Sequence, residues 1–258
     1  MVLNMIREKV QNKITKNEIL FKAYSNLRFL IQIIKIRNLN LKKLRLFLKV
    51  KPYTMISLHR LLNIYELSES VEKNKLKGAF VECGVWKGGC SAVMAYVAKK
   101  VKSNRKIWLF DSFEGLPEPT GKDGTRAKNF ASNRTSGSLK TINKNVGTIQ
   151  HVKRIFSKLR INMTNVNIRK GWFQHTLPKA KKEIGDIAIL RLDGDWYEST
   201  KVCLENLYDP VVQGGFVVID DYGTWEGCKK AVDEFFKKRN LKVKLIKTDN
   251  TEFYFKKI

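Results

Sequence analysis

The stretch "ILRLDGDWYEST", residues 189–200, decides the fold because an apolar run ends abruptly in acidic residues. Asp193, Asp195 and Glu198 fall within six residues. A second stretch, "GGFVVIDDYGTW" at 214–225, repeats the pattern with Asp220 and Asp221 after its apolar run. Short apolar runs bounded by polar residues are typical of buried strands. Two strands that both end in acid predict a functional site at one edge of a sheet.

Strands and helices are expected to alternate around these two stretches. The expected strands are 79–85, 106–113, 166–173, 187–195 and 215–222, and the expected helices are 90–101, 137–160, 200–211 and 227–240. This order predicts an α/β protein with a mostly parallel sheet and helices on both faces. Residues 242–248 and 252–258 are expected to form an antiparallel hairpin around Asp249 and Asn250.

Residues 1–51 are predicted to form a basic helical arm before a main domain of residues 52–258. Pro52 marks the boundary because proline ends a helical pattern. Apolar residues recur at helical spacing through the arm, at Leu27, Leu30, Ile31, Ile34, Leu41, Leu44 and Leu48. Such a helix packs on its own domain or on a dimer mate, or lies on an anionic membrane.

The chain is strongly basic, with a net charge of +26. Residues 1–51 hold 13 Lys/Arg against Glu8 and Glu18, which gives +11 and leaves +15 for the rest. This excess favours anionic partners, such as nucleic acid or acidic lipid, or reflects a solvated lysine-rich surface. No basic run is interleaved with aromatic residues as in a single-strand nucleic-acid platform, so nucleic acid is not the expected partner.

The location suggested by the sequence is cytoplasmic. The four cysteines form no CxxC pair and are expected to be reduced thiols. No apolar signal region stands near the start, and the most apolar segment, "FLIQIIKI", is too short to span a bilayer. The expectation is an intracellular protein that is at most peripheral at the inner membrane face.

The turn after the first expected strand suits a nucleoside ligand. It reads "FVECGVWKGG", residues 80–89, and its glycines allow close backbone approach before a helix N-terminus. Asp111 lies 27 residues beyond Gly84 at the end of the second strand, where an acid can accept hydrogen bonds from a ribose. With Glu82 facing an ammonium group, the three features fit S-adenosylmethionine; a plain glycine turn with a capping acid is the alternative.

Several strings in order give a more specific indication. The chain contains "FVECGVWKGG", "DSFEGLPEP", "GWFQHTLP", "LRLDGDWYEST", "LENLYDPVVQGGFVVIDDYG" and "AVDEFF". Between about Tyr53 and Phe236 it resembles the macrocin O-methyltransferase (TylF) family. The resemblance implies a class I methyltransferase with a seven-stranded sheet and helices on both faces. It also implies methylation of a sugar hydroxyl of a glycoside, dependent on S-adenosylmethionine and a metal, and a tendency to dimerise through the N-terminal region.

The acidic strand ends are the expected metal site. Neighbouring parallel strands bring Asp193, Asp220 and Asp221 to one edge of the sheet, where their charges repel unless a cation bridges them. Oxygen ligands of this kind suit Mg²⁺. The resemblance assigns the metal to these three residues. We also expect Asp193 to act as the base that accepts the proton of the sugar hydroxyl.

Other residues are weaker candidates. Thr54 and Met55 resemble the family's cofactor-lid segment, and Ser91 and Ser112 contact the cofactor or serve as simple caps. Trp172 stacks on adenine or belongs to the core.

Tyr197 and Glu198 are expected to shape the acceptor side. The alternatives to a glycoside acceptor are a catechol-like hydroxyl, or RNA binding and RNA methylation suggested by the basic charge. A membrane-associated scaffold built on the arm is a further alternative.

Overall fold

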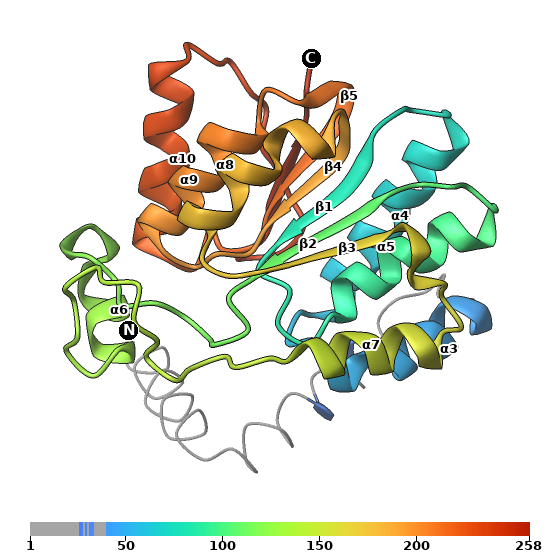
Figure 1. The fold of residues 1–258 in the computed structure, drawn as a ribbon, viewed down its shortest axis with the longest axis horizontal. Coiled ribbons are helices and arrows are strands. Elements are labelled where there is room, and N and C mark those ends of the chain that lie inside the picture. Colours follow the sequence, from blue (N-terminus) through green and yellow to red (C-terminus); the bar gives the residue numbers. More distant parts are fainter. Residues whose placement is uncertain (1–25, 28, 30, 34–39) are drawn as a thin grey trace.

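The computed structural model describes residues 26–27, 29, 31–33 and 40–258, and these form a three-layer α/β structure around one sheet (Figure 1). The sheet has seven strands in the order β3-β2-β1-β4-β5-β7-β6. The strands are β1 (Ala79–Cys83), β2 (Ile107–Asp111), β3 (Val166–Lys170), β4 (Ile187–Leu192), β5 (Val211–Ile219), β6 (Ile246–Lys247) and β7 (Phe253–Lys256). This arrangement confirms the expected class I methyltransferase fold.

Strands β1 to β5 are parallel, and β7 is antiparallel to both β5 and β6. The expected C-terminal hairpin is therefore present, with β7 beside β5 and β6 at the edge. Leu192 pairs with Cys83 on one side and with Ile219 on the other. This register brings the first residues after β1, β4 and β5 to the same edge of the sheet.

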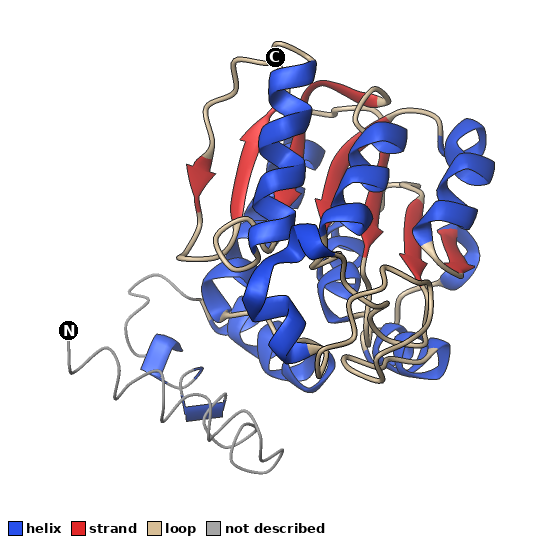
Figure 2. Cartoon of the chain, turned by 90° about the vertical axis from the view of Figure 1, so that its left-hand side faces the viewer, coloured by secondary structure: helices blue, strands red, loops and turns tan. Residues whose placement is uncertain are grey.

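Helices cover both faces of the sheet. One face carries α3 (Leu41–Val50), α4 (Leu58–Lys73), α5 (Gly89–Lys100) and α7 (Ile149–Lys158). The other carries α8 (Phe173–Ile184), α9 (Tyr197–Leu207) and α10 (Glu226–Lys238), which stand in front of the strands in Figure 2. Every residue of β1 and β4 is buried, as expected for parallel strands covered on two sides.

The segment between β2 and β3 differs from its prediction. A helix was expected over 137–160, but only α7 forms, preceded by irregular chain and by the short helix α6 (Gly124–Phe130). Thr148 accepts a hydrogen bond from the His151 N–H and so begins α7. Asn143 and Asn145 have positive φ angles, which interrupt any helix before it.

The third strand is shorter than expected. The prediction ran to Phe173, but β3 ends at Lys170 and Gly171 turns the chain with a φ of +137°. Helix α8, which sequence reasoning missed, begins directly afterwards. Trp172 and Phe173 therefore belong to the edge of the sheet where the strands end.

The described part of the N-terminal arm packs on the main domain. Leu46, Phe47 and Val50 of α3 are buried in one apolar cluster with α4 and α5, whereas Leu41 and Leu48 are exposed. Most of residues 1–39, including Leu30 and Ile34, lie outside the described residues. The division at Pro52 stays a prediction. In the described part of the chain, no helix has the length and apolar character needed to cross a bilayer.

Candidate active site

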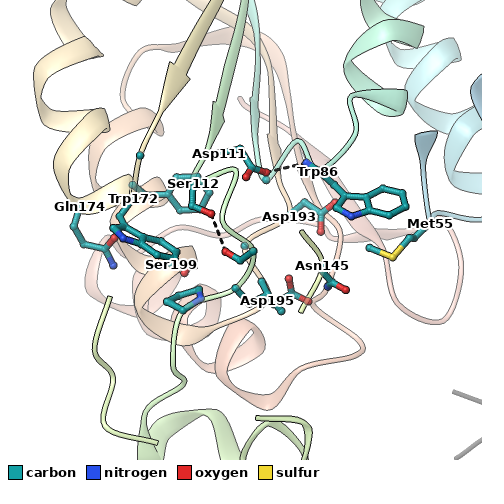
Figure 3. A pocket seen from close by; sticks show the side chains of 17 residues that line it. Met55, Trp86, Asp111, Ser112, Asn145, Trp172, Gln174, Asp193, Asp195 and Ser199 are labelled. Atoms are coloured by element: carbon teal, nitrogen blue, oxygen red, sulfur yellow. Dashed lines mark hydrogen bonds between the residues drawn. The ribbon is translucent and has the colours of Figure 1, made fainter. Parts of the chain in front are cut away.

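A pocket opens where β1, β2, β3 and β4 end (Figure 3). Its volume is about 590 Å³, including space open to solvent. The lining comes from six segments: Met55; Gly84 and Trp86; Asp111, Ser112 and Gly115–Pro117; Asn145; Gly171–Gln174; and Asp193–Asp195 with Ser199. The lining combines aromatic rings, amide groups and acids, so the pocket can hold a ligand with both an aromatic ring and polar groups.

The glycine turn after β1 allows the strand ends to come close together. Gly84 has a φ of +90°, and a Cβ at this position would overlap the carbonyl oxygen of Asp193. A Cβ at Gly89 would lie 2.6 Å from the carbonyl oxygen of Tyr53. Glycine is therefore required for β4 and for the segment before α4 to approach the start of α5.

Asp111 holds this turn in place. Its Oδ2 accepts hydrogen bonds from the N–H groups of Val85 (2.7 Å) and Trp86 (2.8 Å). Its Oδ1 accepts one from the N–H of Phe113 at 2.6 Å. Burial raises the pKa of Asp111, and these three hydrogen bonds oppose the shift. A carboxylate offers about four acceptor positions, so one remains for a ligand such as a ribose hydroxyl.

The candidate cofactor residues fall into two groups. Met55, Gly84, Asp111, Ser112 and Trp172 line the pocket, as expected for contacts with a cofactor.

Glu82, Ser91 and Thr54 are buried outside the set of residues that line the pocket. Ser91 donates a hydrogen bond to Glu82, and Thr54 accepts one from the Ile56 N–H. Their expected contacts with a cofactor stay predictions.

The acidic part of the pocket is a cluster of three carboxylates. Asp193, Asp195 and Asp221 each offer an oxygen, and these oxygens all lie within 4.8 Å of one another. Burial first, and then repulsion from Asp220, raises the pKa of Asp193 to about 6. Burial and the neighbouring aspartates also raise the pKa values of Asp195 and Asp221 well above the ordinary range. Burial and mutual repulsion therefore both penalise ionisation of these three carboxyl groups when no cation is bound.

Asp220, the third residue of the predicted metal set, lies between two arginines. Its Oδ1 accepts a hydrogen bond from Arg191, and its Oδ2 accepts one from Arg60 at 2.6 Å. The structure thus brings Asp193 and Asp221 together with Asp195, while Asp220 lies beside this group. Each Asp220 oxygen retains a second acceptor position after it has bound its arginine.

Arg191 and Arg60 are the functional candidates that sequence reasoning missed. Arg191 is the last residue but one of β4 and has a fully buried side chain, and it also contacts Glu82 and Asp193, both at 2.8 Å. One signal was available for Arg191: a charged residue interrupts the apolar run "IAILRL". A charge buried in a strand requires partners, and the nearby strand ends supply them. Arg60 lies in an ordinary amphipathic helix, which gives no such signal.

The two candidate acceptor residues do not face the main pocket. The hydroxyl of Tyr197 donates to Glu234 at 2.5 Å, which raises the pKa of Tyr197 to about 12. Glu198 lines a small adjoining hollow with Pro117 and Trp196, and it lies 3.6 Å from the ammonium group of Lys122. Their role on the acceptor side stays a prediction.

The acidic cluster fits a divalent cation. One oxygen of Asp221, Oδ2, is buried and has no hydrogen-bond partner. A buried carboxylate oxygen without a partner is costly, and the other two acids of the cluster face the same space. Hard oxygen ligands are the ones that Mg²⁺ prefers. The donor set and the unpaired oxygen therefore both suit this ion.

Comparison with known proteins identifies the family. The macrocin-O-methyltransferase (TylF) family model matches residues 2–257. The demethyldecarbamoylnovobiocin O-methyltransferase of Streptomyces niveus is 37% identical over 207 residues, which cover 80% of this chain and 76% of that protein. An O-methyltransferase of Streptomyces olivaceus, which acts on a rhamnosyl tetracenomycin C, is 33% identical and covers 79% of this chain and 75% of its own length.

Solved structures agree. The structure of the O-methyltransferase NovP, 37% identical, aligns with a TM-score of 0.69 over 80% of this chain and 82% of its own. A calicheamicin methyltransferase shares the fold with a TM-score of 0.60 at 17% identity, over 85% of this chain and 94% of its own. The chain therefore belongs to the macrocin-O-methyltransferase (TylF) family and is an S-adenosylmethionine-dependent O-methyltransferase.

Proposed function

We propose that this enzyme methylates a sugar hydroxyl of a glycoside with the help of Mg²⁺. The observation that carries the proposal is one continuous pocket, which joins the glycine turn and Asp111 to the acids Asp193 and Asp195. A methyl donor and an acceptor hydroxyl that bind in one pocket can meet at the short distance that methyl transfer requires. The names of the relatives support a sugar acceptor, since one is named for methylating the 4′ position of a rhamnosyl group.

The donor occupies the part of the pocket nearest the glycine turn. Asp111 accepts a hydrogen bond from a ribose hydroxyl, and Trp172 offers a ring face to the adenine. Ser112 lines the same part, with its hydroxyl donated to the Gly115 carbonyl oxygen at 2.8 Å. Met55, which is 44% exposed, borders the pocket from the segment before α4 and limits access of water to the donor.

The acceptor occupies the part nearest the acids. We propose that Asp193, Asp220 and Asp221 hold Mg²⁺, with Asp220 retaining its two arginines. When bound, the ion would lower the pKa of an acceptor hydroxyl and fix its direction. The family resemblance places Asp195 outside the ligand set; its carboxylate accepts a hydrogen bond from the Trp225 indole N–H at 2.7 Å.

Asp193 is the proposed base. It accepts the hydroxyl proton as the oxygen attacks the methyl group and the sulfonium leaves as a neutral thioether. As a proposed ligand of the ion, Asp193 would lie beside the hydroxyl that the ion directs, within reach of its proton. We expect Asp193→Asn to fold normally and to lose turnover by at least about 100-fold. Turnover near the wild-type value would contradict this role.

Calorimetric titration of S-adenosylmethionine, followed by Mg²⁺, tests the site without an acceptor. We expect wild type to bind both, and the Asp220→Ala/Asp221→Ala double variant to bind only S-adenosylmethionine. Asp195→Asn is the matched control, because it changes an acid of the same cluster outside the proposed ligand set. Failure of wild type to bind Mg²⁺ would contradict the metal site.

Release of S-adenosylhomocysteine in the presence of candidate acceptors tests the substrate class. A panel of rhamnosides and other glycosides is compared with catechols at equal concentrations. Faster release with glycosides is expected, and release with catechols alone would favour a phenolic acceptor instead.

We further propose a cytoplasmic homodimer whose residues 1–51 contact an acidic membrane, as the +11 charge of this segment suggests. Flotation with anionic liposomes, with and without residues 1–39, tests the membrane contact while α3 stays in place. Loss of binding in the shortened protein is expected, and equal binding would contradict it.

A further inference from the structure

Arg60 connects the acidic site to a distant part of the chain. It lies in the first turn of α4, and its side chain is 14% exposed. Its guanidinium donates to Oδ2 of Asp220 at 2.6 Å and to Oδ2 of Asp249 at 2.8 Å, and it also contacts Thr251. Asp220 follows β5, whereas Asp249 and Thr251 belong to the turn between β6 and β7. One side chain therefore joins three separate segments.

The orientation of Arg60 is fixed by its neighbours. Ser57, which caps the start of α4, is three residues before Arg60, and Asn63 is three residues after it, so the three side chains lie on one face. Ser57 donates to Asp249 at 2.9 Å, and Asn63 donates to Glu252 at 2.9 Å. Hydrogen bonds from Ser57 and Asn63, on both sides of Arg60, therefore hold this face against the β6–β7 turn.

Asp249 is itself held rigidly. Its Oδ1 accepts hydrogen bonds from the N–H groups of Thr251 (2.9 Å) and Glu252 (3.0 Å). Arg60 and these N–H groups lower the pKa of Asp249 although burial alone would raise it. The ionised Asp249 carboxylate therefore holds the Arg60 guanidinium in the position where it also contacts Asp220.

Asp220 needs this support because it is surrounded by acids. Arg191, its other cation, is shared with Glu82 and Asp193. Arg60 forms no hydrogen bond or ion pair with those two acids among the described residues, so Asp220 is the active-site acid that it contacts directly, while its charge also opposes the rise in the pKa of Asp193 and Asp221. The planar guanidinium bonds to Asp220 and Asp249 with different nitrogens, which a lysine ammonium on a flexible stem cannot reproduce.

We propose that Arg60 is a positioning residue that orients the Asp220 carboxylate for the divalent cation, with Asp249 orienting Arg60 in turn. The inference rests on the proposed metal site. Groups that hydrogen-bond to ligating carboxylates typically change metal affinity by about 10- to 100-fold when they are removed. The lost orientation of Asp220 is expected to outweigh the removal of one positive charge, so Arg60→Met weakens Mg²⁺ binding.

The competing explanation is that Arg60 only stabilises the packing of α4 and does not affect the metal site. Arg105 provides the control. Arg105 bonds to Glu72 near the opposite end of α4 at 2.6 Å. The side chains of Arg105 and Glu72 are 8% and 6% exposed, against 14% and 5% for Arg60 and Asp220. Arg105→Met therefore removes a comparable buried ion pair from the same helix without touching the acidic site.

The test is calorimetric titration of Mg²⁺ into the full chain saturated with S-adenosylmethionine. We expect Arg60→Met to bind Mg²⁺ about 10- to 100-fold more weakly than wild type, and Arg105→Met to bind it as wild type does. Arg60→Lys is expected to fall between wild type and Arg60→Met, and it carries the test if Arg60→Met does not fold. Asp249→Asn should weaken Mg²⁺ binding in wild type but add nothing in the Arg60→Met background.

The outcomes separate the two proposals. If wild type binds Mg²⁺ and Arg60→Met binds it equally well or more tightly, the positioning role is overturned and the metal site stands. An equal loss in Arg105→Met also overturns it, because the effect would then be one of general stability. If wild type binds S-adenosylmethionine but no Mg²⁺, the metal site fails and the role of Arg60 fails with it.

Discussion

Asp111 after β2 and Asp221 after β5 are both buried acids at the same edge of one sheet, but their surroundings differ. Asp111 accepts three backbone hydrogen bonds. Asp221 has a buried oxygen with no partner and faces Asp193 and Asp195. Burial raises the pKa of both acids, and only in Asp221 do neighbouring charges add to the shift.

This contrast divides the pocket into a region that the chain itself completes and a region that it leaves for a ligand. The glycine turn is held by peptide N–H groups, so its shape does not depend on an added ion. The acidic end is held by Arg191 and Arg60, whose two positive charges face more carboxylates than they can neutralise. The predictions below test this difference.

The largest expected effect is the loss of Arg191. Arg191→Met leaves Glu82, Asp193 and Asp220 without a shared cation, and removal of one partner from a buried ion pair typically costs about 3–5 kcal/mol. The free energy of unfolding from urea titration at pH 7 measures it. Arg169→Met, which breaks an exposed ion pair with Glu183, is the control and should cost no more than about 1 kcal/mol. Similar losses in both variants would mean that the acidic end needs no internal cation.

The next effect concerns pH. Burial is the main cause that raises the pKa of Asp193 to about 6, of Glu82 to about 7 and of Glu252 to about 8. A raised carboxyl pKa means that the folded state binds more protons than the unfolded state between the two values. Stability without metal should therefore fall as the pH rises from about 5 to about 8.

Unfolding in urea across this pH range, with and without Mg²⁺, provides the measurement. Mg²⁺ should reduce the fall, because the ion stabilises the ionised carboxylates that protons otherwise neutralise. Asp249 has the opposite sign: its lowered pKa adds stability that is lost only as the pH falls below about 4. A metal-free protein whose stability rises steadily from pH 5 to pH 8 would contradict the excess of buried negative charge.

Asp111→Asn should have a smaller effect. In the variant, the amide NH₂ group replaces a carboxylate oxygen and faces at least one backbone N–H group that now donates to Asp111. That N–H group loses its acceptor, and an unpaired buried donor costs about 1–3 kcal/mol. The variant should also bind S-adenosylmethionine more weakly, as calorimetry would show. Asp186→Asn, at an exposed position before β4, is the control. Unchanged stability of Asp111→Asn would show that the turn does not depend on this acid.

The parts of the fold that the sequence predicted are those with strong local patterns. The continuous apolar runs of β1, β4 and β5 and their acidic ends could be recognised directly. The irregular segment 131–148 could not, because its course depends on contacts far apart in sequence, such as the close approach of Gly115 to the carbonyl oxygen of Lys144.

The sequence predicted where the site lies, but not which side chains form hydrogen bonds and ion pairs with its acids. Asp111 and Asp193 line the pocket as expected, because strand ends fix their positions. Glu82 follows the same rule in sequence, yet it is buried against Arg191 and Ser91. Which acid of a strand end faces a pocket and which faces an arginine depends on side chains from other elements, and Arg60 of α4 is one of them.

The smallest expected effect is that of Asp221→Asn, which compares Asp221 with Asp111 most directly. Asp221→Asn is the same chemical change as Asp111→Asn, but it removes a charge from a cluster whose members repel one another. We therefore expect the metal-free variant to be more stable than wild type, by about 0.5–1 kcal/mol at pH 8, while Mg²⁺ binding is lost. Urea unfolding and calorimetry measure the two changes. If the stability falls in Asp111→Asn and rises in Asp221→Asn, Asp111 stabilises the fold and Asp221 binds the ion. A loss of stability at both positions would mean that the Asp221 carboxylate makes stabilising contacts within the protein. The acidic end of the pocket would then need no bound cation for its stability.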